Sequence, residues 1–218
     1  MSVIKGTVVV TGANGSLGSA ITKQLASQPE YSGYRGLFVV RDVTKADALK
    51  PVLTNTPHPN DPISLDLCNL DKVRRTAETI NKHVKTREIP STQTLVLNAG
   101  VNDFGKQFWT KDGLDVTFCA NYLGHWLWTL LLLNSINKDL GRIVVLRSQP
   151  HDPDGERNAK THAFEEEKYK ASMDDEARFD TIAKGTWSSA QEDPSLGGFR
   201  RYGASKLFII IMIHELQC

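Results

Sequence analysis

The chain has 218 residues, which favours one domain with enough length for a substantial hydrophobic core. Its formal net charge of +1 gives no indication of nucleic acid or an acidic membrane surface as a partner. The three cysteines, Cys68, Cys119 and Cys218, are scattered and have no metal-ligand spacing, which suits a reducing compartment. We therefore expect a cytoplasmic protein without a metal site.

The most apolar runs cover residues 126–133 and 207–213. Both are shorter than the roughly 20 residues of a membrane-spanning helix. No signal peptide precedes the first expected strand, which begins a few residues after Met1. We expect these runs to form buried helices and expect no membrane partner.

Strands and helices are expected to alternate along the chain. The expected strands are mostly continuous apolar runs, which is typical of parallel strands buried on both faces; they cover residues 7–11, 36–41, 62–67, 94–100 and 142–148. Helical patterns cover residues 16–28, 43–53, 69–87, 112–137 and 202–217. The alternation predicts a doubly wound parallel α/β sheet over 1–218, with ligands bound at the carboxyl ends of the strands.

Residues 149–201 interrupt this alternation. The segment is polar, with 12 Asp and Glu against 8 Lys and Arg, and has no strong strand pattern. Part of it, near 163–180, has a helical pattern, and Trp187 and Phe199 favour some packing. A substrate lid and a disordered surface loop both remain open as interpretations of this insertion.

The stretch TVVVTGANGSLGSAI, residues 7–21, joins a β-branched run to a helical pattern through Gly12, Gly15 and Gly18. Glycine permits positive φ and close approach of a ligand, and the following helix begins with free N–H groups. The stretch predicts a site for a nucleotide pyrophosphate. A glycine-rich turn without a ligand is the alternative.

Residues after the second and third strands bear on the cofactor. Arg41 follows the apolar Val40 and could pair with a 2′-phosphate, or it could be an ordinary surface residue with Asp42 as a helix N-cap. Asp66 could accept a hydrogen bond from an adenine amino group or cap the helix that begins near Asn69.

The stretches NAG, at 98–100, and YGASK, at 202–206, each carry weak signals alone. Small residues at 98–100 let a flat ring lie against the backbone, and the Asn98 amide can hold the turn. Tyr202 and Lys206 are four residues apart and share a helix face, where the ammonium would stabilise a phenolate and make an acid–base pair.

The ordered set of these motifs, with NYLGH at 121–125 and Ser148 after the fifth strand, resembles the short-chain dehydrogenase/reductase family over essentially the whole chain. The resemblance implies a Rossmann fold and carbonyl–alcohol interconversion with a nicotinamide cofactor. It implies that Tyr202 is the acid–base residue, that Ser148 hydrogen-bonds the substrate oxygen, and that Lys206 holds the nicotinamide ribose and tunes Tyr202. Lys206 and Asn121 would relay the replacement proton through water. The implied cofactor-binding residues are Thr11, Gly12, Asn14, Gly15, Ser16, Leu17, Gly18, Arg41, Asp66, Leu67, Asn98, Ala99, Gly100, Tyr202 and Lys206.

The stretch VVRDVTKA resembles family members that prefer NADP(H), so NAD(H) is the less expected cofactor. The chain departs from the family pattern in two places. Ser148 and Tyr202 are 54 residues apart rather than about 13, and the chain ends before the family's last two strands and substrate-binding loop. A truncated, non-catalytic nucleotide-binding protein or inactive reductase fragment is therefore the alternative, and turnover is expected to be far below that of a complete relative.

Two further expectations concern the apolar central helix. The stretch NYLGHWLWTLLLLNSI is apolar on more faces than one sheet requires, which predicts a homodimer or homotetramer built on the long helices. His125, inside this stretch, is interpreted as a packed residue rather than a metal ligand. The substrate is expected to be a small-molecule carbonyl or alcohol.

Overall fold

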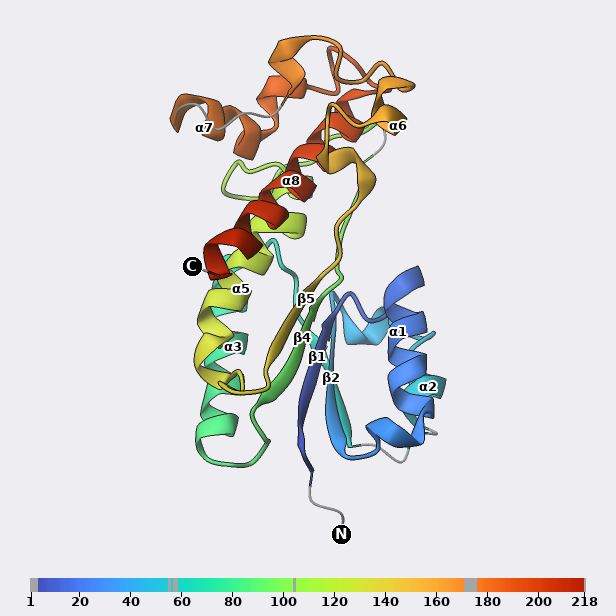
Figure 1. Cartoon of the computed structure of the whole chain (residues 1–218), viewed down its shortest axis with the longest axis vertical. Coiled ribbons are helices and arrows are strands. Elements are labelled where there is room, and N and C mark those ends of the chain that lie inside the picture. Colours follow the sequence, from blue (N-terminus) through green and yellow to red (C-terminus); the bar gives the residue numbers. More distant parts are fainter. Residues whose placement is uncertain (1–3, 55, 57–58, 104, 171–175, 218) are drawn as a thin grey trace. The chain divides into compact units, whose positions relative to one another are not determined.

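A computed structural model describes residues 4–54, 56, 59–103, 105–170 and 176–217 (Figure 1). The chain divides into two compact units, of which the first contains residues 1–99 and 127–146 and the second contains residues 100–126 and 147–218. The single domain expected over 1–218 stays a prediction. Cys218 lies outside the described residues, while Cys68 is partly buried and Cys119 is buried.

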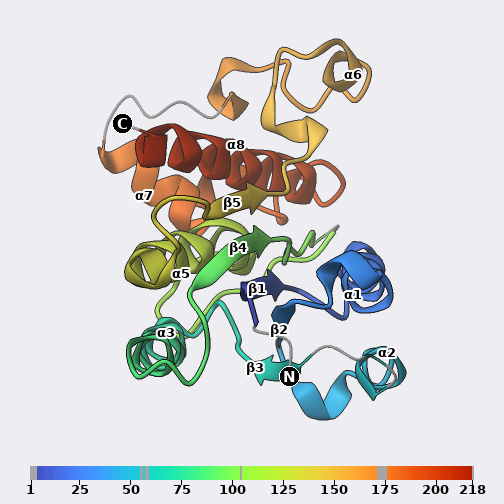
Figure 2. The same cartoon turned by 60° about the horizontal axis from the view of Figure 1, so that its bottom comes forward.

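The first unit contains one five-stranded sheet in the order β3-β2-β1-β4-β5, and every neighbouring pair is parallel (Figure 2). The strands are β1 (Gly6–Thr11), β2 (Tyr34–Val40), β3 (Asn60–Ser64), β4 (Thr92–Leu97) and β5 (Arg142–Val145). This order confirms the predicted doubly wound parallel sheet. The chain reverses direction of winding between β1 and β4, and the crevice at such a point is where open α/β sheets bind ligands.

Burial differs between the middle and the edges of this sheet. All six residues of β1 are buried, as are the last five of β2. The edge strands β3 and β5 are only partly buried, and Val144 on β5 is exposed. The prediction of strands buried on both faces therefore holds for the centre and is wrong for the edges, where the side chains of β3 and β5 stay partly open to solvent.

Helices cover both faces of the sheet in the first unit (Figures 1 and 2). α1 (Ser16–Ser27) and α2 (Lys50–Thr54) lie on one face, and α3 (Leu70–Lys85) lies on the other with residues 127–132 of α5 (Gly124–Leu132). α3 buries Val73, Ala77 and Ile80, a helical spacing that the sequence predicted. The helix predicted over 43–53 is instead a 3₁₀ turn, Val43–Lys45, followed by α2, because Pro51 fits the first turn of a helix and not its interior.

The helix predicted over 112–137 begins later and is not uniform. Asp115 caps it, with its Oδ1 accepting a hydrogen bond from Phe118 N at 3.1 Å. α4 (Val116–Phe118) leads into a π turn, Cys119–Leu123, and then into α5. The 20-residue stretch Val116–Ser135 is long and apolar enough to cross a membrane by length and composition, a test that buried core helices also pass. This stretch is longer than either of the apolar runs, 126–133 and 207–213, on which the expectation of no membrane partner was based.

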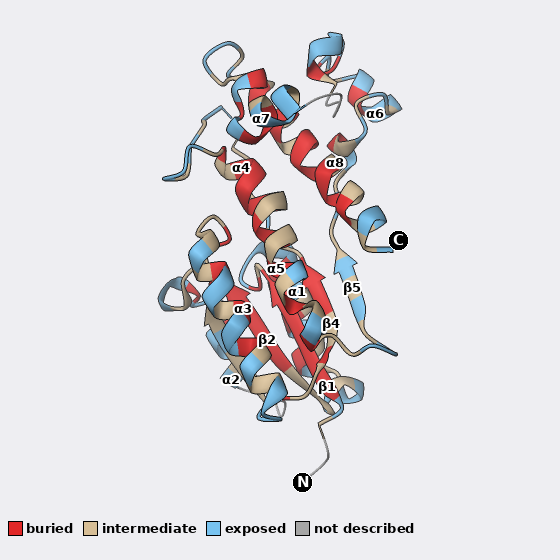
Figure 3. Ribbon diagram, turned by 90° about the vertical axis from the view of Figure 1, so that its left-hand side faces the viewer, coloured by how far each residue is buried: buried red, intermediate tan, exposed pale blue. Residues whose placement is uncertain are grey.

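The insertion 149–201 is built into the second unit by a hydrophobic core. It contains α6 (Glu156–Ala159), α7 (Glu176–Lys184) and the 3₁₀ turns Gln149–His151, Glu167–Tyr169 and Thr186–Ser188, and its described residues contain no strand. α8 (Gly197–Gln217) begins five residues before the predicted start. The buried cluster, visible as red faces of α4, α7 and α8 in Figure 3, comprises Phe118, Ala163, Phe164, Tyr169, Ile182, Ala183, Trp187, Ala204 and Phe208. The interpretation as a disordered surface loop is therefore wrong for the described part of the insertion.

Candidate functional site

Close backbone packing requires two of the three glycines after β1, Gly12 and Gly18. Gly12 has a φ of +66°, and a Cβ there would lie 2.7 Å from Ala99 Cα. A Cβ on Gly18 would lie 1.9 Å from Gly12 O, whereas one on Gly15 would lie 3.3 Å from the same atom. Gly12 and Gly18 therefore allow α1 to begin directly against the turn, whether or not a ligand is bound.

Asn98 and Thr11 join the ends of β1 and β4. Asn98 Nδ2 donates to Thr11 O at 2.9 Å and to Gly12 O at 3.1 Å. Thr11 Oγ1 accepts hydrogen bonds from the backbone N–H groups of Asn98 and Ala99, at 2.9 and 3.1 Å. These bonds support the expected role of Asn98 in holding the turn, and they give Thr11 a role of the same kind.

The start of α1 has the properties of an anion site. Gly15 is its N-cap and contributes no side-chain hydrogen bond, so backbone N–H groups of the first turn are not capped by that residue. Asn14, Gly15, Ser16 and Leu17 are exposed, and Leu17 is 57% exposed although it is apolar. The glycine cradle and the open helix start fit the pyrophosphate of a dinucleotide.

Arg41 lies one residue beyond the end of β2 and is exposed, while Val40 is buried. Asp42 caps the following 3₁₀ turn, because its Oδ1 accepts hydrogen bonds from Thr44 N at 2.9 Å and Thr44 Oγ1 at 2.7 Å. These two bonds lower the pKa of the Asp42 carboxyl. The described residues form no ion pair with Arg41, so its guanidinium is accessible to an anion.

Asp66 does not cap α3. The cap is Asn69, whose Oδ1 accepts a hydrogen bond from Lys72 N at 2.9 Å. Asp66 Oδ1 instead accepts from Cys68 N at 2.9 Å in a local turn, and the side chain is partly exposed beside buried Leu67. The structure therefore removes the capping alternative for Asp66 and leaves its expected bond to adenine as a prediction.

In the second unit, Asn121 is a fully buried junction within the π turn. Its Oδ1 accepts from Val101 N at 2.8 Å, and its Nδ2 donates to Val101 O at 2.9 Å. Nδ2 also donates to Ser205 Oγ at 2.9 Å, and Ser205 Oγ donates to Tyr202 O at 2.7 Å. The amide therefore ties the central helix to the loop after residue 100 and to the part of α8 that carries Tyr202.

Tyr202 and Lys206 share one face of α8, as the spacing predicted. Lys206 Nζ lies 5.7 Å from the centre of the Tyr202 ring, and the lysine is only 4% exposed. Burial lowers the pKa of the Lys206 ammonium. A Cβ on Gly100 would lie 3.6 Å from Lys206 Nζ and 3.4 Å from Asn121 Oδ1, so the small residue at 100 leaves room beside both groups.

Ser148 does not end β5, which stops at Val145. It is instead the residue before the 3₁₀ turn Gln149–His151, and its side chain does not cap that turn. A Cβ on Gly203 would lie 2.4 Å from Pro150 O, so the segment just after Ser148 packs against α8 next to Tyr202. The segment after Ser148 thus packs against α8, although Ser148 and Tyr202 are 54 residues apart in sequence.

Sequence reasoning missed two groups in this unit. The first is the buried pair Asp115 and Arg201, whose Oδ2 and Nε lie 3.1 Å apart; Arg201 also donates from Nη1 to Ser188 O at 2.6 Å. The second is Ser205, which links Asn121 to α8. Two features of the sequence indicate the polar neighbours of Asn121. His125 lies four residues after Asn121, and Ser205 lies directly before Lys206.

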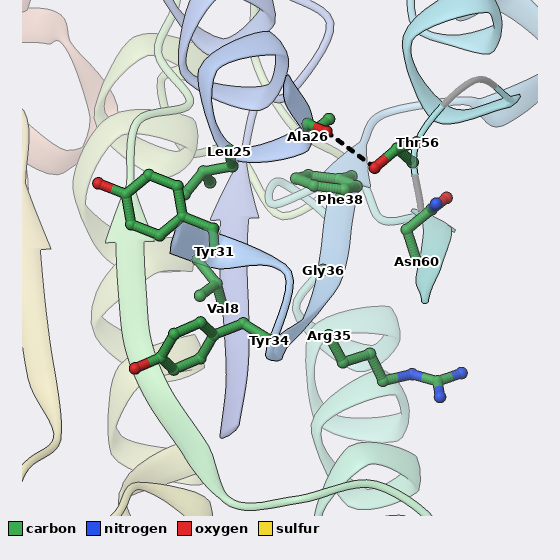
Figure 4. Close-up of a pocket in the computed structure, with 10 residues that line it drawn as sticks. All are labelled: Val8, Leu25, Ala26, Tyr31, Tyr34, Arg35, Gly36, Phe38, Thr56 and Asn60. Atoms are coloured by element: carbon green, nitrogen blue, oxygen red, sulfur yellow. Dashed lines mark hydrogen bonds between the residues drawn. The ribbon is translucent and has the colours of Figure 1, made fainter. Parts of the chain in front are cut away.

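Two cavities of the described residues are lined by side chains other than those of the glycine turn. One, of about 310 Å³, is lined by residues of α1 and β2 and includes Tyr31 and Phe38, with Thr56 Oγ1 donating to Ala26 O at 2.9 Å beside it (Figure 4). Another, of about 990 Å³, is open and polar and is lined by Arg147, Ser148, Gln149, His151, Asp152, Gly155, Glu156 and Arg157. Within the part of the chain that the structure describes, no group of three His, Cys, Asp or Glu side chains could hold a metal ion.

Comparisons with known proteins agree with this geometry. A model of the short chain dehydrogenase family matches residues 6–154. Short-chain dehydrogenase iccH of Talaromyces variabilis is 37% identical over 98% of this chain and 64% of its own length. Mouse retinol dehydrogenase 13 is 34% identical over 66% of this chain and 41% of its own length. The chain thus spans less than two thirds of the length of these relatives.

Among solved structures, a metagenomic short-chain oxidoreductase in complex with NADP matches with a TM-score of 0.63. It is 19% identical, and the match covers 99% of this chain and 76% of that one, which shows a shared fold. The family model matches more than half of the chain, which settles the family. The ordered turn, Asn121, Tyr202 and Lys206 agree with it. The protein belongs to the short-chain dehydrogenase family of oxidoreductases.

Proposed function

We propose that the chain is an NADP(H)-dependent oxidoreductase that interconverts a carbonyl and an alcohol. The observation that carries this proposal is the arrangement of Tyr202 and Lys206 on one face of α8, tied to Asn121 through Ser205. The family membership supports the same reaction class.

The nicotinamide supplies or accepts the hydride when the cofactor is bound. Tyr202 would donate a proton to the carbonyl oxygen during reduction, and Ser148 would donate a second hydrogen bond to that oxygen. Lys206, as a buried ammonium, would favour the tyrosinate that remains and would hold the nicotinamide ribose. Lys206 and Asn121 would return the proton to Tyr202 through water.

The preference for NADP(H) over NAD(H) rests on exposed Arg41 after buried Val40, since a guanidinium can bind a 2′-phosphate bidentately. One structural neighbour is a complex with NADP, which is compatible with this choice. Fluorescence titration with NADPH and NADH should show tighter NADPH binding in the parent protein. Arg41→Ala should remove that preference, and equal affinities in the parent protein would contradict it.

The test of the reaction is NADPH oxidation over a panel of carbonyl compounds, with Tyr202→Phe as the matched variant. We expect turnover in the parent protein and a loss of about 100- to 10,000-fold in Tyr202→Phe, with a much smaller change in NADPH affinity. Cofactor binding without turnover on any carbonyl would instead favour a non-catalytic nucleotide-binding protein.

Two further properties are proposed with the function. A homodimer or homotetramer would cover apolar side chains such as exposed Leu130 on α5, and light scattering that shows only monomer would contradict it. A cytoplasmic location fits the three scattered cysteines of the sequence. The proposed substrate is a small molecule.

A further inference from the structure

His125 contacts the backbone of Asn121 inside the second unit. Its side chain is fully buried, and its Nδ1 lies 3.1 Å from Asn121 O. Because a carbonyl oxygen only accepts, the hydrogen of this bond must be on Nδ1. The ring therefore uses Nδ1 as a donor toward the backbone of the residue one turn earlier.

The surroundings keep this ring neutral. Burial, against the opposing effect of the bond to Asn121 O and with a smaller contribution from the positive charge of Lys206, lowers the pKa of His125 to about 4. A charged imidazole would place a second buried cation near Lys206. The neutral ring with its hydrogen on Nδ1 is the form that satisfies both the charge and the hydrogen bond.

The carbonyl that His125 contacts belongs to Asn121, whose side chain links the segments next to the central helix by hydrogen bonds. Asn121 binds both backbone groups of Val101 and the hydroxyl of Ser205, next to Lys206. It lies in the π turn Cys119–Leu123, where the helix changes its hydrogen-bond register. A side-chain donor at a carbonyl of this turn adds a hydrogen bond outside the backbone ladder, so His125 can help to fix the shape of the turn.

We propose that His125 is a positioning residue, which holds the Asn121 carbonyl through its Nδ1–H and thereby sets the places of Val101, Ser205 and Lys206. The expected effect on catalysis rests on the proposed function, whereas the effect on structure does not. His125 would influence the rate through the placement of Lys206 and Tyr202, without touching the substrate.

The tautomer is tested in the parent protein by NMR of ¹⁵N-labelled histidine side chains. We expect a neutral His125 ring with its hydrogen on Nδ1 at pH 7, and the same form at pH 5.5. A ring protonated on Nε2 alone, or an imidazolium at pH 7, would overturn the proposal. This measurement requires neither activity nor a variant.

The positioning role is tested by comparing His125→Asn with His125→Gln. The Asn amide nitrogen takes the place of Nδ1, whereas the Gln amide nitrogen lies farther out, near the place of Nε2. We expect His125→Asn to retain kcat within about threefold and His125→Gln to lose about 10- to 100-fold in kcat. Equal kcat values for the two variants would contradict the proposal.

Backbone amide shifts separate this proposal from the proposed function. His125→Gln should move the amide signals of Val101, Ser205 and Lys206, and His125→Asn should leave them near their parent positions. If the parent protein lacks turnover and these shifts still follow the expected pattern, the proposed reaction fails and the positioning role stands. Unchanged shifts in His125→Gln would overturn the positioning role.

Discussion

The two units bury different kinds of polar side chain. Among the described residues, those buried in the first unit are all hydroxyls: Thr7, Thr11, Thr22, Thr92, Thr129 and Ser135. Those buried in the second unit include charged groups, amides and an imidazole: Asp115, Thr117, Asn121, His125, Asn158, Ser188, Arg200, Arg201, Ser205 and Lys206. The sheet unit is therefore organised by backbone pairing and apolar burial, and the second unit depends on specific polar partners.

This difference has a physical reason and a functional one. A buried hydroxyl can be satisfied by a nearby carbonyl, as Thr7 Oγ1 is by Pro90 O at 2.7 Å. A buried charge needs a partner of opposite sign and several further bonds, which distant segments of the chain must supply. The second unit contains all four expected catalytic side chains, and it also contains the buried charges that need such partners. The free energy of unfolding of the second unit should therefore be more sensitive to single polar substitutions than that of the sheet unit.

The strongest test of this comparison is Arg201→Met. The substitution would leave Asp115 buried without its cation, in a site where burial already raises the pKa of the carboxyl. We expect the free energy of unfolding to fall by about 3–5 kcal/mol, measured by urea denaturation. The double variant Asp115→Leu/Arg201→Met should recover a large part of that loss. A loss below about 1 kcal/mol in the single variant would show that the second unit does not depend on this pair.

The largest expected effect in the sheet unit is steric. Gly18→Ala would place a methyl group 1.9 Å from Gly12 O, so the turn after β1 must shift. We expect a loss of about 3 kcal/mol in urea denaturation and loss of NADPH binding by fluorescence titration. Gly15→Ala is the matched control, since its Cβ would lie at 3.3 Å from the same oxygen, and it should change stability far less. Equal losses in both variants would contradict this account of the turn.

Acid should destabilise the second unit through His125. The pKa of this group is depressed to about 4 in the folded protein, below its ordinary value of 6.5, so the unfolded chain binds the proton first. The associated stability is complete above pH 6.5 and is lost as the pH falls toward 4. Between pH 7 and pH 5, we expect the free energy of unfolding of the parent protein to fall by about 2 kcal/mol more than that of His125→Asn. Parallel stability curves for the parent and His125→Asn would refute this expectation.

The same contrast explains what the sequence could predict. Continuous apolar runs and the glycine spacing report local geometry, so the parallel sheet, the turn after β1 and the shared face of Tyr202 and Lys206 were predictable. The structure of the insertion was not predictable, because it depends on aromatic packing between distant residues such as Phe118 and Phe179, whose ring centres lie 5.8 Å apart. The Asp115–Arg201 pair joins residues 86 positions apart, and no local pattern marks such a pair.

The smallest expected effect separates structural from cofactor-binding roles after β3. Asn69 caps α3, so Asn69→Ala should lower the free energy of unfolding by about 1 kcal/mol in urea denaturation, with NADPH affinity unchanged. Asp66 accepts one local bond from Cys68 N, so Asp66→Ala should cost less stability and should weaken NADPH binding if the carboxylate binds adenine. Asn69→Asp, which retains the capping oxygen, is the control for the first variant. An Asp66→Ala protein with the parent affinity for NADPH would identify Asp66 as a turn residue alone.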